Sequence, residues 1–286
     1  MVEIMELIVA KSIGFCSGVK RAVQGVRQML FCPKLSTDKE AVYCLGEIIH
    51  NPQVVEELRE QGMIIVNDIE EVPEKSRFII RSHGLSREVI EMAHERKLII
   101  HDFTCPKVKK IHTLVKDLTA DGYPIFIAGN SKHPEVKAIK SLASKNSKII
   151  EDEENVPEDV CGEKNAIVVQ TTFNPDRFLS IVQRIVSRSK KTLIYNTLCE
   201  ETIKRQSEAR DLSQKVDLVI IVGGKKSSNT KTLYEIVSAH TYAFHIESEA
   251  ELKREWFSGV HTVGLVSGAS TPEEMVRVVT EKIRAF

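Results

Sequence analysis

Short runs of apolar, mostly β-branched residues alternate with longer amphipathic segments along the whole chain. Apolar runs bounded by glycine and proline predict buried strands, and apolar residues repeating every three or four positions predict helices. Strands that alternate with helices indicate parallel sheets built from βαβ units. We expect strands at residues 7–10, 42–45, 78–80, 98–100, 125–128, 167–170, 193–195, 218–222 and 263–266.

The segments between these runs show where the helices begin. Pro52, Pro134, Pro175 and Pro272 stand where first turns of helices are expected, because proline fits the start of a helix. The polar stretch 151–164 is predicted to be an exposed excursion.

Three cysteines share one position in this pattern. Cys16, Cys105 and Cys199 each lie in a turn between a predicted strand and a predicted helix. Such a turn lies at the carboxyl edge of a sheet, where open α/β folds place ligands. The adjoining helix N-terminus favours thiolate, the form that binds metal. Their spacing of roughly ninety residues suggests one cysteine per repeated unit.

The order of predicted elements around each cysteine repeats along the chain, although the amino acids themselves do not. Each cysteine is followed by a helix, a strand that ends in glycine, a polar tip and another helix, and the next strand ends in small polar residues. We therefore predict an α/β fold of three similar units with mostly parallel sheets, arranged pseudo-threefold around a common centre. The expected units are residues 14–102, 103–195 and 196–286, the last joined by an N-terminal strand within 1–13.

Composition limits the classes of function. A chain of 286 residues can bury about three quarters of its unfolded surface. Forty basic and forty acidic residues give no reason to expect nucleic acid or an anionic membrane as partner. No apolar run approaches the roughly 20 residues of a membrane span, and the N-terminus carries acid where a signal peptide carries base. We expect a cytoplasmic protein whose cysteines are not disulfides.

The three thiolates suit two kinds of metal centre. Zinc would take a three-cysteine site with one open position, and an iron–sulfur cluster held by three cysteines would keep one iron free as a Lewis acid. The chain has no pair of cysteines two residues apart, which is common in structural zinc sites, so a cluster is favoured. The alternative is three buried small side chains. Cys32, Cys44 and Cys161 lack the turn position, and Cys44 reads as core.

The polar tips resemble an anion site, because backbone N–H groups at helix starts favour negative charge. Helix capping and satisfied core histidines are the alternatives for single residues. Glu135, in the first turn after His133, is either an acid placed there by the helix dipole or a proton donor whose pKa is raised by burial beside an anion. The polar residues at issue are His50, His83, His133, Thr171, Ser227, Ser228, Asn229 and Ser270.

Taken together and in order, eight motifs resemble the LytB family of 4-hydroxy-3-methylbut-2-enyl diphosphate reductases, over nearly the whole chain. Each contains one or more of the residues discussed above. The motifs are residues 14–19, 47–52, 81–84, 104–106, 133–136, 170–172, 227–230 and 268–270.

The resemblance implies a specific reaction. The substrate hydroxyl is removed reductively to give isopentenyl and dimethylallyl diphosphates, the last step of the non-mevalonate isoprenoid pathway. It implies one [4Fe-4S] cluster per chain on Cys16, Cys105 and Cys199, with an open iron, and ferredoxin or flavodoxin as electron donor. Thr171 would lie near the substrate hydroxyl, and Glu135 with His133 would supply protons. The diphosphate donors would be His50, His83, His133, Ser227, Ser228, Asn229 and Ser270.

Two other functions fit the same residues. A hydratase with an open-iron cluster would use the same ligands without net electron transfer. A cluster or zinc protein that senses redox state would need no diphosphate pocket.

Overall fold

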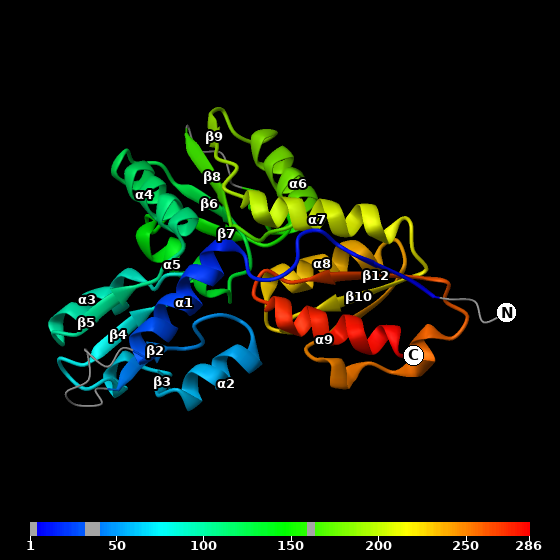
Figure 1. Ribbon diagram of the computed structural model, residues 1–286. Helices are drawn as coiled ribbons and strands as arrows, with labels where there is room; N and C mark the ends of the chain where they lie inside the picture. Colours follow the sequence, from blue (N-terminus) through cyan, green and yellow to red (C-terminus); the bar gives the residue numbers. More distant parts are fainter. Residues whose placement is uncertain (1–4, 32–40, 159–163) are drawn as a thin grey trace. The chain divides into compact units, whose positions relative to one another are not determined.

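The computed structural model describes residues 5–31, 41–158 and 164–286 (Figure 1). Cys32, Cys161 and residues 159–163 of the predicted excursion 151–164 lie outside the described residues. The chain divides into two compact units. Unit 1 comprises Met1–Val19, Ile49–Val54 and Glu200–Phe286, and unit 2 comprises Lys20–Ile48 and Val55–Cys199.

Unit 2 contains two four-stranded parallel sheets. In the first, with order β3-β2-β4-β5, the strands are β2 (Val42–Leu45), β3 (Met63–Val66), β4 (Arg77–Ile80) and β5 (Ile99–Asp102). In the second, with order β7-β6-β8-β9, they are β6 (Ile125–Ala128), β7 (Lys148–Ile150), β8 (Asn165–Val169) and β9 (Thr192–Ile194).

Unit 1 contains the third parallel sheet, with order β1-β12-β10-β11. Its strands are β1 (Glu6–Val9), β10 (Leu218–Val222), β11 (Tyr242–Ile246) and β12 (Thr262–Ser267). Written from β11 to β1, this order has the same plan as the other two sheets, but its last strand comes from the start of the chain.

The helices follow the strands in the same order in each sheet. One helix follows the first strand, one follows the third strand and one follows the fourth. The first set is α2 (Pro52–Glu60), α5 (Pro134–Leu142) and α8 (Ser228–Ser238). The second is α3 (Arg87–Glu95), α6 (Pro175–Val186) and α9 (Glu273–Arg284), and the third is α1 (Ser17–Phe31), α4 (Pro106–Ala120) and α7 (Glu200–Ser213).

Burial explains why these segments form these elements. The inner strands β6, β8 and β10 are buried along their whole length, as expected where helices cover both faces of a parallel sheet. On α4, the buried residues recur at helical spacing, and all but the first share a hydrophobic core with residues of β6 and β8. They are Val108, Ile111, Val115 and Leu118.

The predicted fold class is confirmed: the chain has three similar α/β repeats, each with a parallel sheet, and two of these repeats lie in unit 2. The common centre and the domain bounds stay predictions. Pro52, Pro134 and Pro175 begin helices as predicted, whereas Pro272 is the N-cap of α9. None of the helices within the described ranges is both long and apolar enough to cross a bilayer.

Candidate functional site

The three predicted metal ligands occupy one structural position, repeated once per sheet. Each follows one edge strand of its sheet, β1, β5 or β9, which we call the fourth strand, and immediately precedes a helix. Each backbone N–H donates to the carbonyl of the second residue after the third strand. These bonds are Cys16 N to Ala269 O, Cys105 N to Ser82 O and Cys199 N to Thr171 O, all 3.0 Å.

The thiols suit a metal centre that binds thiolate. Cys16, Cys105 and Cys199 form no disulfide within the described part of the chain and are half-buried, whereas the thiol of Cys44 is fully buried. Burial raises the pKa of Cys44 to about 12, so this thiol stays protonated and packs in the core, as predicted. By contrast, Cys16 Sγ accepts the backbone N–H of Val19 at 3.5 Å, in the first turn of α1.

The polar tips after the first strands are anchored by a second repeated bond. The glycine that follows each first strand donates its N–H to the carbonyl of the last residue of the neighbouring outer strand. The bonds are Gly46 N to Val66 O at 2.9 Å, Gly129 N to Ile150 O at 3.0 Å and Gly223 N to Ile246 O at 2.9 Å. Each tip is therefore fixed at the carboxyl edge of its sheet, the same edge as the cysteine of that sheet.

Glu135 and Thr171 form a buried pair in unit 2. Glu135 is 1% exposed. Thr171 donates to both of its oxygens, from N to Oε1 at 2.7 Å and from Oγ1 to Oε2 at 2.8 Å. Burial raises the pKa of the Glu135 carboxyl, and the two Thr171 bonds oppose this shift without cancelling it. The pair can therefore hold a proton at its Oε2 end.

Two predicted histidines lie together in the same unit. His83 and His133 make an edge-on contact with ring centroids 5.1 Å apart. His133 Nδ1 accepts the N–H of Glu135 at 3.2 Å, which caps α5. The same contact assigns the proton of neutral His133 to Nε2, leaving that nitrogen as a donor.

In unit 1, the predicted tip residues meet through the backbone. Ser270 Oγ donates to the carbonyl of His50 at 3.2 Å. A Cβ on Gly224 would lie 2.2 Å from the same carbonyl oxygen, so only glycine fits there. Asn51, one residue on, caps α2 by accepting the N–H of Val54 at 3.1 Å.

Ser227, Ser228 and Asn229 open helix α8 in unit 1. Ser227 is its N-cap and accepts the N–H of Thr230 at 3.4 Å, so the capping interpretation holds for this side chain. Asn229 is 3% exposed, and neither its Oδ1 nor its Nδ2 finds a hydrogen-bond partner within the described part of the chain. A buried side-chain amide without hydrogen bonds destabilises the folded protein, unless a bound ligand supplies the missing partners.

Some structural residues of the site were not predicted. Arg205 of α7 is buried, and its guanidinium holds the loop before Cys16 by donating to Ser12 O at 2.6 Å, Gly14 O at 2.8 Å and Ser267 O at 3.2 Å. Lys107, two residues after Cys105, donates from Nζ to Cys199 Sγ at 3.3 Å. The sequence could have indicated a role for Lys107 through its position near the candidate ligand Cys105. Nothing in the sequence indicated the role of Arg205.

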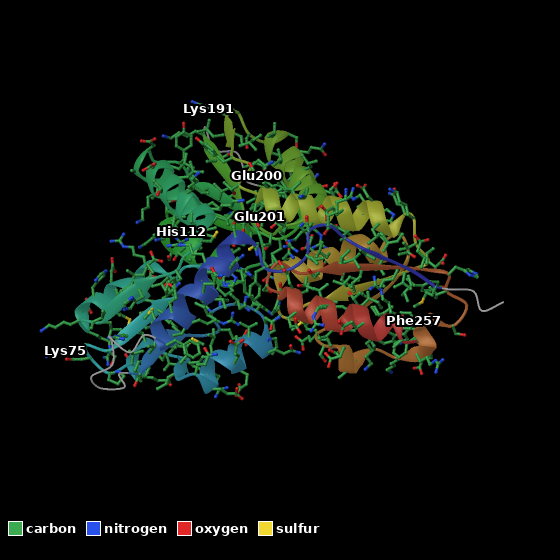
Figure 2. All side chains as sticks on the ribbon, in the orientation of Figure 1. Lys75, His112, Lys191, Glu200, Glu201 and Phe257 are labelled. Carbon is green, nitrogen blue, oxygen red and sulfur yellow. The ribbon has the colours of Figure 1, made fainter. Side chains whose placement is uncertain are left out.

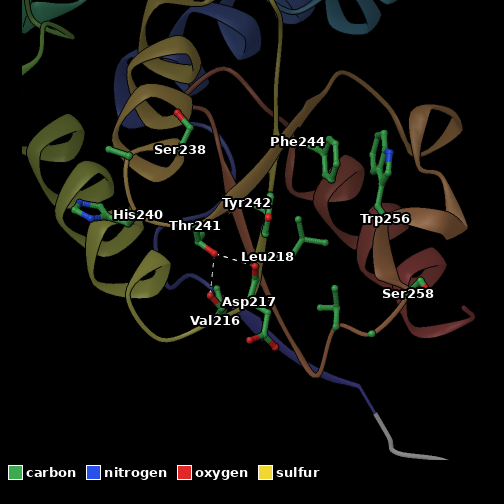
Figure 3. A pocket seen from close by; sticks show the side chains of 13 residues that line it. Val216, Asp217, Leu218, Ser238, His240, Thr241, Tyr242, Phe244, Trp256 and Ser258 are labelled. Carbon is green, nitrogen blue, oxygen red and sulfur yellow. Dashed lines mark hydrogen bonds between the residues drawn. The ribbon is translucent and has the colours of Figure 1, made fainter.

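A hollow of about 910 Å³ lies at the opposite edge of the unit 1 sheet (Figure 3). Its wall includes the stacked rings of Phe244 and Trp256, with centroids 3.9 Å apart, and Tyr242, which is 82% exposed. It contains no residue predicted for the site. The predicted residues of this sheet, by contrast, lie after its strands, at the carboxyl edge.

The chain is similar to known proteins over nearly all its length. Residues 7–284 match the family described as LytB protein. The 4-hydroxy-3-methylbut-2-enyl diphosphate reductase of Geobacter sp. strain M21 is 39% identical over 283 residues, covering 99% of this chain and 98% of the relative. The enzyme of that name from Caldanaerobacter subterraneus is 38% identical over 289 residues, with the same coverage.

Two solved structures are similar as well. One, described as (E)-4-hydroxy-3-methyl-but-2-enyl diphosphate reductase, the terminal enzyme of the non-mevalonate pathway, has a TM-score of 0.69 at 39% identity, covering 99% of this chain and 100% of the other. The E-1-hydroxy-2-methyl-but-2-enyl-4-diphosphate reductase from Plasmodium falciparum has a TM-score of 0.88 at 30% identity, covering 97% and 87%.

The raised pKa of Glu135 predicts a pH dependence of stability. The carboxyl of Glu135 binds its proton more strongly in the folded than in the unfolded chain. This difference stabilises the folded state at pH values below the ordinary carboxyl pKa, and the stabilisation is lost as pH rises through the folded-state pKa. Glu135→Gln keeps the shape and both Thr171 contacts but has no proton to lose. Relative to the parent, this variant should therefore gain stability with rising pH, measured as urea-unfolding midpoints from pH 4.5 to 8.

The exposed Glu154 provides the control. Glu154→Gln should give a pH profile parallel to that of the parent. A constant difference between Glu135→Gln and the parent across this range would show that Glu135 does not hold a proton in the folded chain.

Proposed function

Because the chain belongs to the LytB protein family, we propose that it reduces 4-hydroxy-3-methylbut-2-enyl diphosphate to isopentenyl and dimethylallyl diphosphates. It acts at the last step of the non-mevalonate pathway, taking up two electrons and two protons for each water released. The match to reductases over 99% of this chain and at least 98% of each relative carries this conclusion.

Cys16, Cys105 and Cys199 hold one [4Fe-4S] cluster. Their equivalent turns and their half-buried thiols support this assignment. When bound, the cluster supplies single electrons and an iron without a protein ligand, which polarises the C–O bond. Ferredoxin or flavodoxin delivers the electrons, and the site of action is the cytoplasm.

The chain binds the diphosphate through side-chain hydrogen-bond donors. The Nε2 proton assigned to His133 and the amide of Asn229 are both suited to phosphate oxygens, and the amide lacks another partner within the described residues. Helix starts beside both residues add backbone N–H groups and favourable dipoles. The remaining donors are His50, His83, Ser227, Ser228 and Ser270.

Glu135 and Thr171 supply the proton for the leaving hydroxyl. Because Thr171 N–H occupies Oε1, the acidic proton resides on Oε2, within 2.8 Å of Thr171 Oγ1. Protonated Glu135 donates to Thr171, whose own hydroxyl proton is then free to point at the substrate oxygen. The Thr171 hydroxyl thus links a buried acid to the bond that breaks.

An assay of the anaerobically purified protein tests the function. With dithionite as reductant, it should consume the allylic diphosphate alcohol and form both isomeric products, separated by chromatography. Conversion without any reductant would instead indicate the hydratase. Failure to bind the alcohol diphosphate would indicate a redox-sensing protein.

The ligand assignment predicts a loss of iron on substitution. Cys105→Ser should lower iron and sulfide content and weaken the visible absorption of the cluster, because the thiolate is the soft ligand that iron retains. Cys44→Ser, which changes a buried thiol in the core, should keep the metal content of the folded protein. Equal iron content in the parent and Cys105→Ser would remove Cys105 from the ligand set.

The proton assignment predicts a loss of turnover without a loss of binding. Glu135→Gln preserves the packing but cannot supply a proton, and turnover should fall about 10²–10⁴-fold, as for general acids elsewhere. Cluster content and substrate affinity, measured by iron analysis and calorimetry, should stay close to the parent values. Glu154→Gln serves as control, and turnover of Glu135→Gln at the parental rate would exclude Glu135 as the acid.

A further inference from the structure

Helices that begin at one cysteine make side-chain contacts with the turn of another. In α1, Arg21 Nη1 donates to Thr104 O at 3.1 Å, one residue before Cys105. In α7, Glu201 is labelled in Figure 2. Its carboxylate accepts the backbone N–H of Ser17 at 3.0 Å and also the hydroxyl proton of Ser17. Both contacts join segments next to ligand candidates and leave the sulfurs untouched.

The contact from α4 is different, because it reaches a sulfur. Lys107 is the second residue of α4, and its Nζ lies 3.3 Å from Cys199 Sγ. The lysine is half-buried, as is the cysteine. The N-cap of α4 is therefore Cys105, and the first turn of the same helix carries the ammonium that contacts Cys199.

An ammonium at this distance affects the two oxidation states of an attached cluster unequally. Reduction adds one negative charge to a centre already held by thiolates. A positive charge and an N–H donor at a ligand sulfur stabilise the reduced state more than the oxidised state, which raises the reduction potential. Partial burial strengthens this effect, because the effective dielectric constant falls away from bulk water.

We propose that Lys107 is a positioning residue that raises the reduction potential of the cluster, through the contact between its Nζ and Cys199 Sγ. The inference rests on the cluster of the proposed function and is independent of which substrate that cluster reduces. Lys107 makes electron uptake easier for a donor of given potential, without touching the substrate.

Redox titration of the loaded protein tests this inference. Lys107→Met removes the charge and the donor at similar length, Lys107→Gln keeps an uncharged donor, and Lys107→Arg keeps both. Lys110→Met changes an exposed lysine one turn further along α4 and serves as the matched control. Potentials are measured without substrate, by electron paramagnetic resonance at fixed solution potentials, on samples with counted iron and sulfide.

We expect Lys107→Met to lower the equilibrium constant for one-electron reduction about tenfold, which corresponds to 59 mV. Lys107→Gln should show a smaller fall, and Lys107→Arg and Lys110→Met should stay close to the parent. If Lys107→Met fails to load, a lowered potential in Lys107→Gln still supports the inference.

Two results would overturn it. One is Lys107→Met with full iron content at the parental potential. The other is loss of iron from Lys107→Met while Lys107→Gln titrates like the parent, which would make Lys107 a residue of cluster retention. Both leave the proposed function standing, whereas a parent protein without iron and sulfide would overturn the function as well.

Discussion

The backbone hydrogen bond that each predicted ligand cysteine donates to the segment just after the neighbouring strand is the constraint on which the candidate site depends. It recurs in all three sheets at 3.0 Å, although the segment between the fourth strand and the cysteine differs in length. The register of the sheet, rather than the loop, therefore fixes each thiol at the carboxyl edge. A single bond of this kind contributes only about 0.5–1.5 kcal/mol, but it determines where the sulfur lies.

The sequence predicted the inner framework well, because inner strands of parallel sheets are continuous apolar runs. The bounds of β2, β6 and β10 were predicted without error. The strands β3, β7 and β11 were missed, and all three occupy the same outer position in their sheets. β7 is only three residues long and begins with Lys148, and β11 contains His245, so neither is a long apolar run. β3 is a continuous apolar run, and its sequence does not explain why it was missed.

For the site, the sequence named residues but not their contacts. Glu135 and Thr171 are far apart in the chain, and only the parallel pairing of β6 with β8 brings the ends of these strands together. The role of Arg205 could not be predicted, because it lies in a helix rich in charge and resembles a solvated residue there. Its three carbonyl partners exist only once the loop at Ser12 and the end of β12 meet. Motifs thus identify the chemistry, and sheet topology supplies the geometry.

The parallel pairing of β1 with β12 has a consequence for how the protein forms. During translation, β1 leaves the ribosome before the other described strands, while β12, which it must join, is synthesised after all of them. Until then, this first strand has an unpaired edge that invites incorrect association. The two sheets formed by residues 42–194 need no such wait, since all their strands are made consecutively. The order of synthesis therefore leaves the loop that carries Cys16 as the last of the three cysteine turns to become ordered.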